Sequence, residues 1–139
     1  MKKTAHVRWI QDLQFVATSG SGHATVLDSG GEEGSIGPSP MELVLQGLAG
    51  CTAMDVVFIL KKKRQKTSGC EVHVEGTRAE KHPMIYTDIE LTYTISGKNL
   101  SEKAVHDAVK LSMEKYCSVS AMLGQSARLT HKVVIKEDE

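Results

Sequence analysis

The side chains of this 139-residue chain best suited to covalent chemistry are its three cysteines, Cys51, Cys70 and Cys117. Their number is odd and no two follow a CxxC spacing, so neither a secreted disulfide framework nor a zinc ribbon is indicated. A thiol in a reducing compartment is either reactive as its thiolate or simply buried. Taken alone, each cysteine is expected to be inert, and only a pairing of two favours redox chemistry.

Other candidate groups are weaker. Asp55 follows Cys51 by four residues, so on a helix it shares the cysteine's face, and if that face is buried its negative charge would oppose a reactive thiolate there. Cys70 begins a predicted strand and is expected to be structural. The six histidines show no HxxxH or HxH spacing, so no metal site is expected: His6, His23, His73, His82, His106 and His131.

Composition predicts one soluble globular domain over residues 1–139. Hydrophobic residues make up 40% and charged residues 24% of the chain, and 17 basic residues balance 17 acidic ones. No global charge therefore attracts nucleic acid or a membrane surface, and the basic run 61–64 is expected to be a solvated helix end. Polar residues interrupt the first fifteen positions, which argues against a signal peptide and for a cytoplasmic protein.

The elements that would position the cysteines begin with short strands. Residues 6–10, 13–17 and 24–28 have strand character and predict an antiparallel meander, with a turn at Ser19 to Gly22. Residues 29–39 are rich in glycine, proline and acidic side chains, which indicates a loop.

A long helix is predicted next, and it carries Cys51. Ser39, Pro40 and Glu42 form a capping box with proline at the first helical position, and the basic run 61–64 suits the helix C-terminus. The helix is apolar nearly all round, but Gln46 and Asp55 argue against a membrane span. We therefore expect a central helix packed on several sides, which for so small a chain favours a dimer.

The remaining sequence predicts two strands, two helices and a strand. Residues 70–75 and 85–95 alternate and are joined near Pro83, while a helix capped by Ser101 is expected to end near Tyr116. A short helix over 117–122, closed by Gly124, and a strand over 129–135 complete the chain. The order indicates an α+β domain.

Two of these segments together resemble a known family. PSPMELVLQGLAGCTAMDVV around Cys51 and KYCSVSAML around Cys117 are similar to motifs of the OsmC/Ohr family of peroxide-stress proteins, most of all its small YhfA-type branch. The resemblance spans nearly the whole chain. It implies an OsmC-like fold, in which antiparallel sheets wrap around the long central helices of an intertwined homodimer.

The resemblance also implies an activity. Cys51 matches the family's peroxide-reacting cysteine and Cys117 its resolving cysteine, so the chain is expected to reduce organic hydroperoxides as a thiol-dependent peroxidase, with an external dithiol as reductant and no cofactor or metal. The family's glutamate, ten residues before the first cysteine, is replaced by Met41, which leaves Glu42 one residue late.

The family's arginine has no clear counterpart either. No arginine occurs between Trp9 and Lys63, so Arg8 is the upstream candidate for substrate binding, and Arg78 and Arg128 are candidates elsewhere. Glu42 is also explained as a capping residue and Arg8 as a solvated strand residue. Two alternatives to the peroxidase stay open: a non-catalytic stress protein that binds an apolar ligand at the dimer interface, and a redox sensor.

Overall fold

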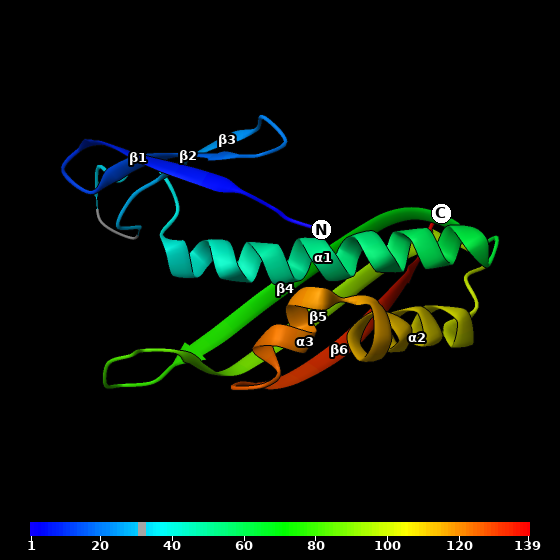
Figure 1. The fold of residues 1–139 in the computed structure, drawn as a ribbon. Helices are drawn as coiled ribbons and strands as arrows, with labels where there is room; N and C mark the ends of the chain where they lie inside the picture. Colours follow the sequence, from blue (N-terminus) through cyan, green and yellow to red (C-terminus); the bar gives the residue numbers. More distant parts are fainter. Residues whose placement is uncertain (31–32) are drawn as a thin grey trace. The chain divides into compact units, whose positions relative to one another are not determined.

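The computed structural model describes residues 1–30 and 33–139, and these divide into two compact units, Met1–Val44 and Leu45–Glu139 (Figure 1). Each unit is described by itself, and the single domain expected over residues 1–139 stays a prediction. Residues 31 and 32, part of the predicted loop over 29–39, lie outside the described residues.

The first unit contains the predicted meander of strands: β1 (Ala5–Gln11), β2 (Gln14–Ser19) and β3 (Ala24–Leu27). Both pairings are antiparallel, with Trp9 opposite Phe15 and Val16 opposite Val26. Asp12 takes a positive φ of 48° in the first turn, where its carbonyl accepts a 2.9 Å hydrogen bond from the Trp9 indole. The predicted antiparallel meander is therefore confirmed.

The helix α1 (Pro40–Lys62) begins at the predicted capping box. The Ser39 amide donates to Glu42 Oε1 (2.9 Å), and the Glu42 amide donates to Ser39 Oγ (3.2 Å). These two bonds satisfy two backbone donors that the first helical turn would leave unpaired. The start of the helix is thus determined locally.

In the part of the chain that the structure describes, one stripe of α1 is buried, although packing on several sides was expected. The stripe follows an i, i+4 spacing and consists of Leu48, Thr52, Val56 and Leu60, all 0% exposed. Exposed side chains on the helix include Met54, Val57 and Phe58. By length and hydropathy α1 also passes the criteria for a membrane span, which core helices of soluble proteins pass as well.

The second unit has a sheet in the order β4, β5, β6, formed by β4 (Lys66–Arg78), β5 (Tyr86–Lys98) and β6 (Arg128–Glu137). β4 and β5 are antiparallel, as expected. β6 pairs with β5 in parallel, with Leu91 opposite His131, so the expectation of antiparallel sheets is corrected for this pair. The reason is the helical connection between them, which returns the chain to the starting end of β5, as a parallel pair requires.

That connection contains α2 (Glu102–Leu111), the π-helical turn η1 (Ser112–Tyr116) and α3 (Ser118–Leu123). Ser101 caps α2 as predicted, because its Oγ accepts from the Ala104 amide at 3.2 Å. The regular helix ends at Leu111, where a helix to near Tyr116 was expected, and η1 fills the remaining five positions. Gly124 ends α3, as predicted.

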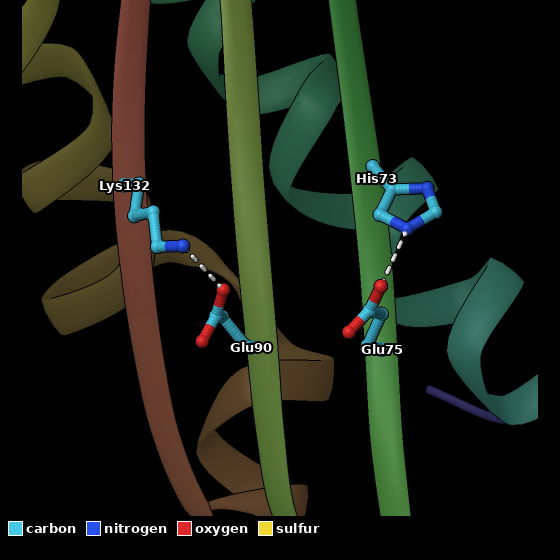
Figure 2. A network of polar contacts seen from close by, with 4 residues as sticks. All are labelled: His73, Glu75, Glu90 and Lys132. Atoms are coloured by element: carbon cyan, nitrogen blue, oxygen red, sulfur yellow. Dashed lines mark hydrogen bonds and ion pairs between the residues drawn. The ribbon is translucent and has the colours of Figure 1, made fainter.

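The two faces of β5 differ in character. Its inward residues form the core with α1 and α2, and four of them are at most 1% exposed: Ile89, Leu91, Tyr93 and Ile95. The outward face of the sheet carries polar pairs, shown in Figure 2: Lys132 Nζ on β6 lies 2.9 Å from Glu90 Oε1 on β5, and His73 Nε2 lies 3.3 Å from Glu75 Oε1, both on β4. Glu75 and Glu90 are direct partners on β4 and β5.

Candidate active site

The buried face of the second unit brings three reactive side chains together. Cys51 and Asp55 lie one turn apart on α1, and Cys117 lies at the junction of η1 and α3. The two sulfur atoms and a carboxylate oxygen of Asp55 all lie within 4.8 Å of one another. Both cysteines are free thiols. Because a disulfide bond is roughly 2 Å long, a modest side-chain movement separates this arrangement from a bridge.

Backbone geometry fixes the position of Cys117. The residue leaves the π-helical turn in an extended conformation, and its amide donates to the Ser112 carbonyl at 2.7 Å. Its sulfur caps α3 by accepting from the Ser120 amide at 3.4 Å. Cys117 is 3% exposed while Cys51 is half-buried, so Cys51 is the more accessible thiol of the two.

Burial raises the pKa of the Cys117 thiol, and the neighbouring Cys51 acts in the same direction, while the Ser120 backbone hydrogen bond opposes it. A backbone amide at the start of a helix favours a thiolate. The amide does act in that sense, but the loss of solvation outweighs it. Cys117 is therefore protonated at neutral pH.

A buried hydrogen-bonded chain leads from the sheet to Asp55. Ser112 Oγ donates to Asp55 Oδ2 (2.9 Å), and Thr52 Oγ1 lies 2.7 Å from Ser112 Oγ and 2.8 Å from the Tyr93 hydroxyl. A hydroxyl has one proton to donate. Since Ser112 uses its proton on the carboxylate, Thr52 must donate to Ser112, and Tyr93 to Thr52.

This chain, which we call the Tyr93 relay (Tyr93, Thr52, Ser112 and Asp55), runs from the buried core to the half-buried Asp55. Tyr93, Thr52 and Ser112 are all 0% exposed, and burial raises the pKa of Tyr93 to about 12. Every buried hydroxyl of the relay has a partner, which is what makes its burial tolerable. The relay fixes the orientation of the Asp55 carboxylate beside the sulfurs.

Sequence reasoning found Asp55 but missed the rest of the relay. The signal was present as a polar residue at an inward position among apolar ones: Thr52 between Leu48 and Val56, and Tyr93 between Leu91 and Ile95. That these positions would meet depended on how α1 crosses the sheet, which spacing does not give.

The remaining predicted site residues lie in the first unit. Glu42 makes the two capping-box bonds described above, and Arg8 lies on the exposed strand β1 opposite Val16. The capping role of Glu42 is confirmed. A binding role for Glu42 or Arg8 stays a prediction.

The other candidate arginines have partners at the sheet. Arg78 Nε donates to the Met84 carbonyl at 2.8 Å, and Arg128 Nε lies 3.3 Å from Asp88 Oδ1. Cys70 lies on β4 opposite Ile95, outside the cluster of Cys51, Asp55 and Cys117, and burial raises its pKa.

A groove of about 560 Å³ opens beside Asp55. It is mostly apolar with two lysines, and it is lined by Asp55, Phe58, Ile59, Lys62, Lys63, Leu111 and Tyr116. An apolar pocket with a few polar groups is typical of a small-molecule site.

Comparisons with known proteins give consistent matches. A family model described as "OsmC-like protein" matches residues 30–132. Protein YhfA of Escherichia coli (strain K12) is 45% identical over 127 residues, which are 91% of this chain and 93% of that protein.

Similar solved structures include an OsmC-like protein from Mycoplasma pneumoniae (18% identity, TM-score 0.86, 98% of each chain). An organic hydroperoxide resistance protein from Elizabethkingia anophelis also matches (12% identity, TM-score 0.68, 99% of this chain and 97% of that one). At these identities, the two structures show a shared fold alone.

Proposed function

Because this chain belongs to the OsmC-like family, we propose that it is a thiol-dependent peroxidase that reduces organic hydroperoxides with Cys51 and Cys117 as its redox pair. The observation that carries the proposal is the approach of the two sulfurs to within 4.8 Å, from positions far apart in the sequence. The fold shared with an organic hydroperoxide resistance protein supports the substrate class.

The unequal exposure of the two thiols suggests their roles. The half-buried Cys51 attacks the distal peroxide oxygen as its thiolate; the O–O bond breaks, the alcohol leaves with a proton, and Cys51 becomes a sulfenic acid. The buried Cys117 then attacks the Cys51 sulfur, water leaves, and a disulfide forms. An external dithiol restores both thiols by exchange.

The groove beside Asp55 is suited to the organic part of the substrate. Phe58, Ile59 and Leu111 provide apolar contact. Lys62 and Lys63, which also line the groove, supply positive charge. One helical turn separates this groove from Cys51. A bulky hydroperoxide such as cumene hydroperoxide should therefore be a better substrate than hydrogen peroxide.

We also propose that the protein acts as a cytoplasmic homodimer. Met54, Val57 and Phe58 on α1 are 75%, 45% and 59% exposed, an unusual state for large apolar side chains on a long helix. A second copy packed on this face would supply the packing that the sequence predicts for the helix.

The direct test is peroxide consumption by the purified protein with cumene hydroperoxide and a dithiol reductant. Cys51→Ser should abolish turnover, because serine cannot form the sulfenic acid. Cys117→Ser should allow one oxidation but slow the reset, and Cys70→Ser, the matched control, should keep full activity. Equal turnover by the Cys51 and Cys70 variants would exclude the proposed role of Cys51.

A second candidate is a redox sensor or a non-catalytic ligand-binding protein of the same fold. It is favoured because two arginines that were candidates for binding the substrate have other partners: Arg78 contacts the Met84 carbonyl, and Arg128 contacts Asp88. Alkylation by iodoacetamide distinguishes these functions from the peroxidase. A Cys51 that reacts only above about pH 8.5, as an ordinary thiol does, supports the non-catalytic protein. Disulfide formation without repeated turnover supports the sensor.

A further inference from the structure

The cluster that the peroxidase would use has the composition of a metal site. Two thiol sulfurs and a carboxylate oxygen, from Cys51, Cys117 and Asp55, lie within 4.8 Å of one another. We propose that the reduced protein binds one thiophilic divalent cation, Zn²⁺ by its ligand chemistry, through these three side chains, with water as the fourth ligand. Zinc sites with three protein ligands and an open position are a known class.

The spacing of the ligands suits this assignment. Tetrahedral ligands roughly 2.0–2.3 Å from zinc are about 3.3–3.8 Å apart, so the cluster needs only a small contraction. Cys51 and Asp55 are at i and i+4 of α1, a spacing by which a helix places two metal ligands on one face. Cys117 comes from a different segment, where its backbone amide donates a hydrogen bond to the Ser112 carbonyl.

The carboxylate is also supported in the way that metal ligands usually are. Ser112 donates to Asp55 Oδ2 at 2.9 Å, which leaves Oδ1 for the cation. Ser112 is 0% exposed and is itself held by Thr52, so the support is rigid. Removal of such a supporting hydrogen bond typically weakens metal binding by about 10- to 100-fold.

Charge is balanced by neighbouring groups. Two thiolates and one carboxylate around a divalent cation leave one net negative charge, and Lys62 and Lys63 line the groove that Asp55 shares. The cation must displace the protons of both thiols, so binding should release protons and should weaken as the pH falls.

Metal binding and disulfide formation exclude one another, because both use the same sulfur electrons. Oxidation of the bound dithiolate by a hydroperoxide would pass two electrons to the peroxide, take up two protons from solvent, give an alcohol, water and the disulfide, and release the cation. This consequence rests on the proposed function, whereas the binding itself does not.

The test uses the full chain, reduced and free of metal and oxygen, titrated with Co²⁺ as a spectroscopic probe and then with Zn²⁺. We expect one cobalt ion per chain, a thiolate-to-cobalt charge-transfer band and displacement by zinc. Cys51→Ser and Cys117→Ser should lose the band, while Cys70→Ser should keep it. Asp55→Asn and Ser112→Ala should each weaken binding by about 10-fold or more.

A readout without substitutions guards against variants that fail to fold. Zn²⁺ should protect Cys51 and Cys117, but not Cys70, from iodoacetamide in the unaltered protein. Equal labelling of all three thiols with and without zinc would overturn the proposal, and so would a cobalt band that persists when Cys51 and Cys117 are both serine.

Failure of the metal site and failure of the peroxidase give different results. Peroxide turnover is measured on metal-free protein with a chelator present. Turnover without cobalt binding refutes only the metal site, and cobalt binding without turnover refutes only the peroxidase.

Discussion

The two faces of strand β5 carry polar contacts of similar length in opposite environments. Inward, the Tyr93 hydroxyl lies 2.8 Å from Thr52 in the Tyr93 relay; outward, Glu90 lies 2.9 Å from Lys132 (Figure 2). Tyr93 is 0% exposed, while the Lys132 side chain is 67% exposed. Distance alone therefore says little about what each contact contributes.

Solvent explains the difference. When an outward pair is broken, water replaces the lost partner and salt already screens the charges. When a bond among the fully buried Tyr93, Thr52 and Ser112 is broken, no water can take its place, and the remaining polar group stays buried without a partner. The inward face should therefore fix the geometry of the cysteine site, and the outward face should be dispensable.

The largest effect is expected for Ser112→Ala. It leaves both Thr52 and Asp55 without their shared partner, so the free energy of unfolding should fall by about 3 kcal/mol. Chemical denaturation of the variant and the unaltered protein measures this difference in the free energy of unfolding. Ser118→Ala, an exposed serine a few residues away, is the matched control. Equal effects of the two changes would contradict the importance of burial.

Tyr93→Phe should cost less at neutral pH, about 1 kcal/mol, because one hydrogen bond at the end of the relay is lost. Its clearer signature is in alkali. The folded pKa of Tyr93 is about 12, against an ordinary value of 10.0, so the folded state binds more protons in this interval. The stabilisation that the raised pKa of Tyr93 contributes is fully present below pH 10 and is lost as the pH rises towards 12.

A shift of this size corresponds to roughly 3 kcal/mol. Denaturation midpoints across this interval should fall in the unaltered protein and fall less in Tyr93→Phe. Tyr116→Phe, at an exposed tyrosine, should follow the unaltered protein. The raised pKa of Cys117 acts in the same direction above its ordinary value of 9.0, so Cys117→Ser should flatten the start of the curve.

The smallest effect is expected for Lys132→Ala on the outward face. Its pKa is raised by Glu90, which marks a real attraction, but the Lys132 side chain is 67% exposed and that of Glu90 is 45% exposed. The free energy of unfolding should stay within experimental error of the original at physiological salt. A loss as large as that of Ser112→Ala would show that the ion pairs of this face hold the sheet together.

The features that sequence predicted well are those set by neighbouring residues. The start of α1 follows from Ser39, Pro40 and Glu42, whose bonds span three positions. The proximity of Asp55 to Cys51 follows from helical spacing.

Non-local features were harder to predict. The parallel pairing of β6 depends on the path of the preceding helices, and the π-helical turn η1 departs from a regular pattern that continues through it. The meeting of Cys51 with Cys117 was implied by the family resemblance, because no local pattern connects residues so far apart. The Tyr93 relay could not be predicted, because its residues meet only through the way in which α1 crosses the sheet.

The most direct test of the proposed chemistry is whether Cys51 and Cys117 form a bond to each other when the protein reacts with a peroxide. Reduced protein should be treated with one equivalent of cumene hydroperoxide, alkylated, digested without reduction and analysed by mass spectrometry. We expect a Cys51–Cys117 disulfide within one chain and an alkylated Cys70. A disulfide that contains Cys70, or a Cys51 oxidised while Cys117 remains a free thiol, would contradict it.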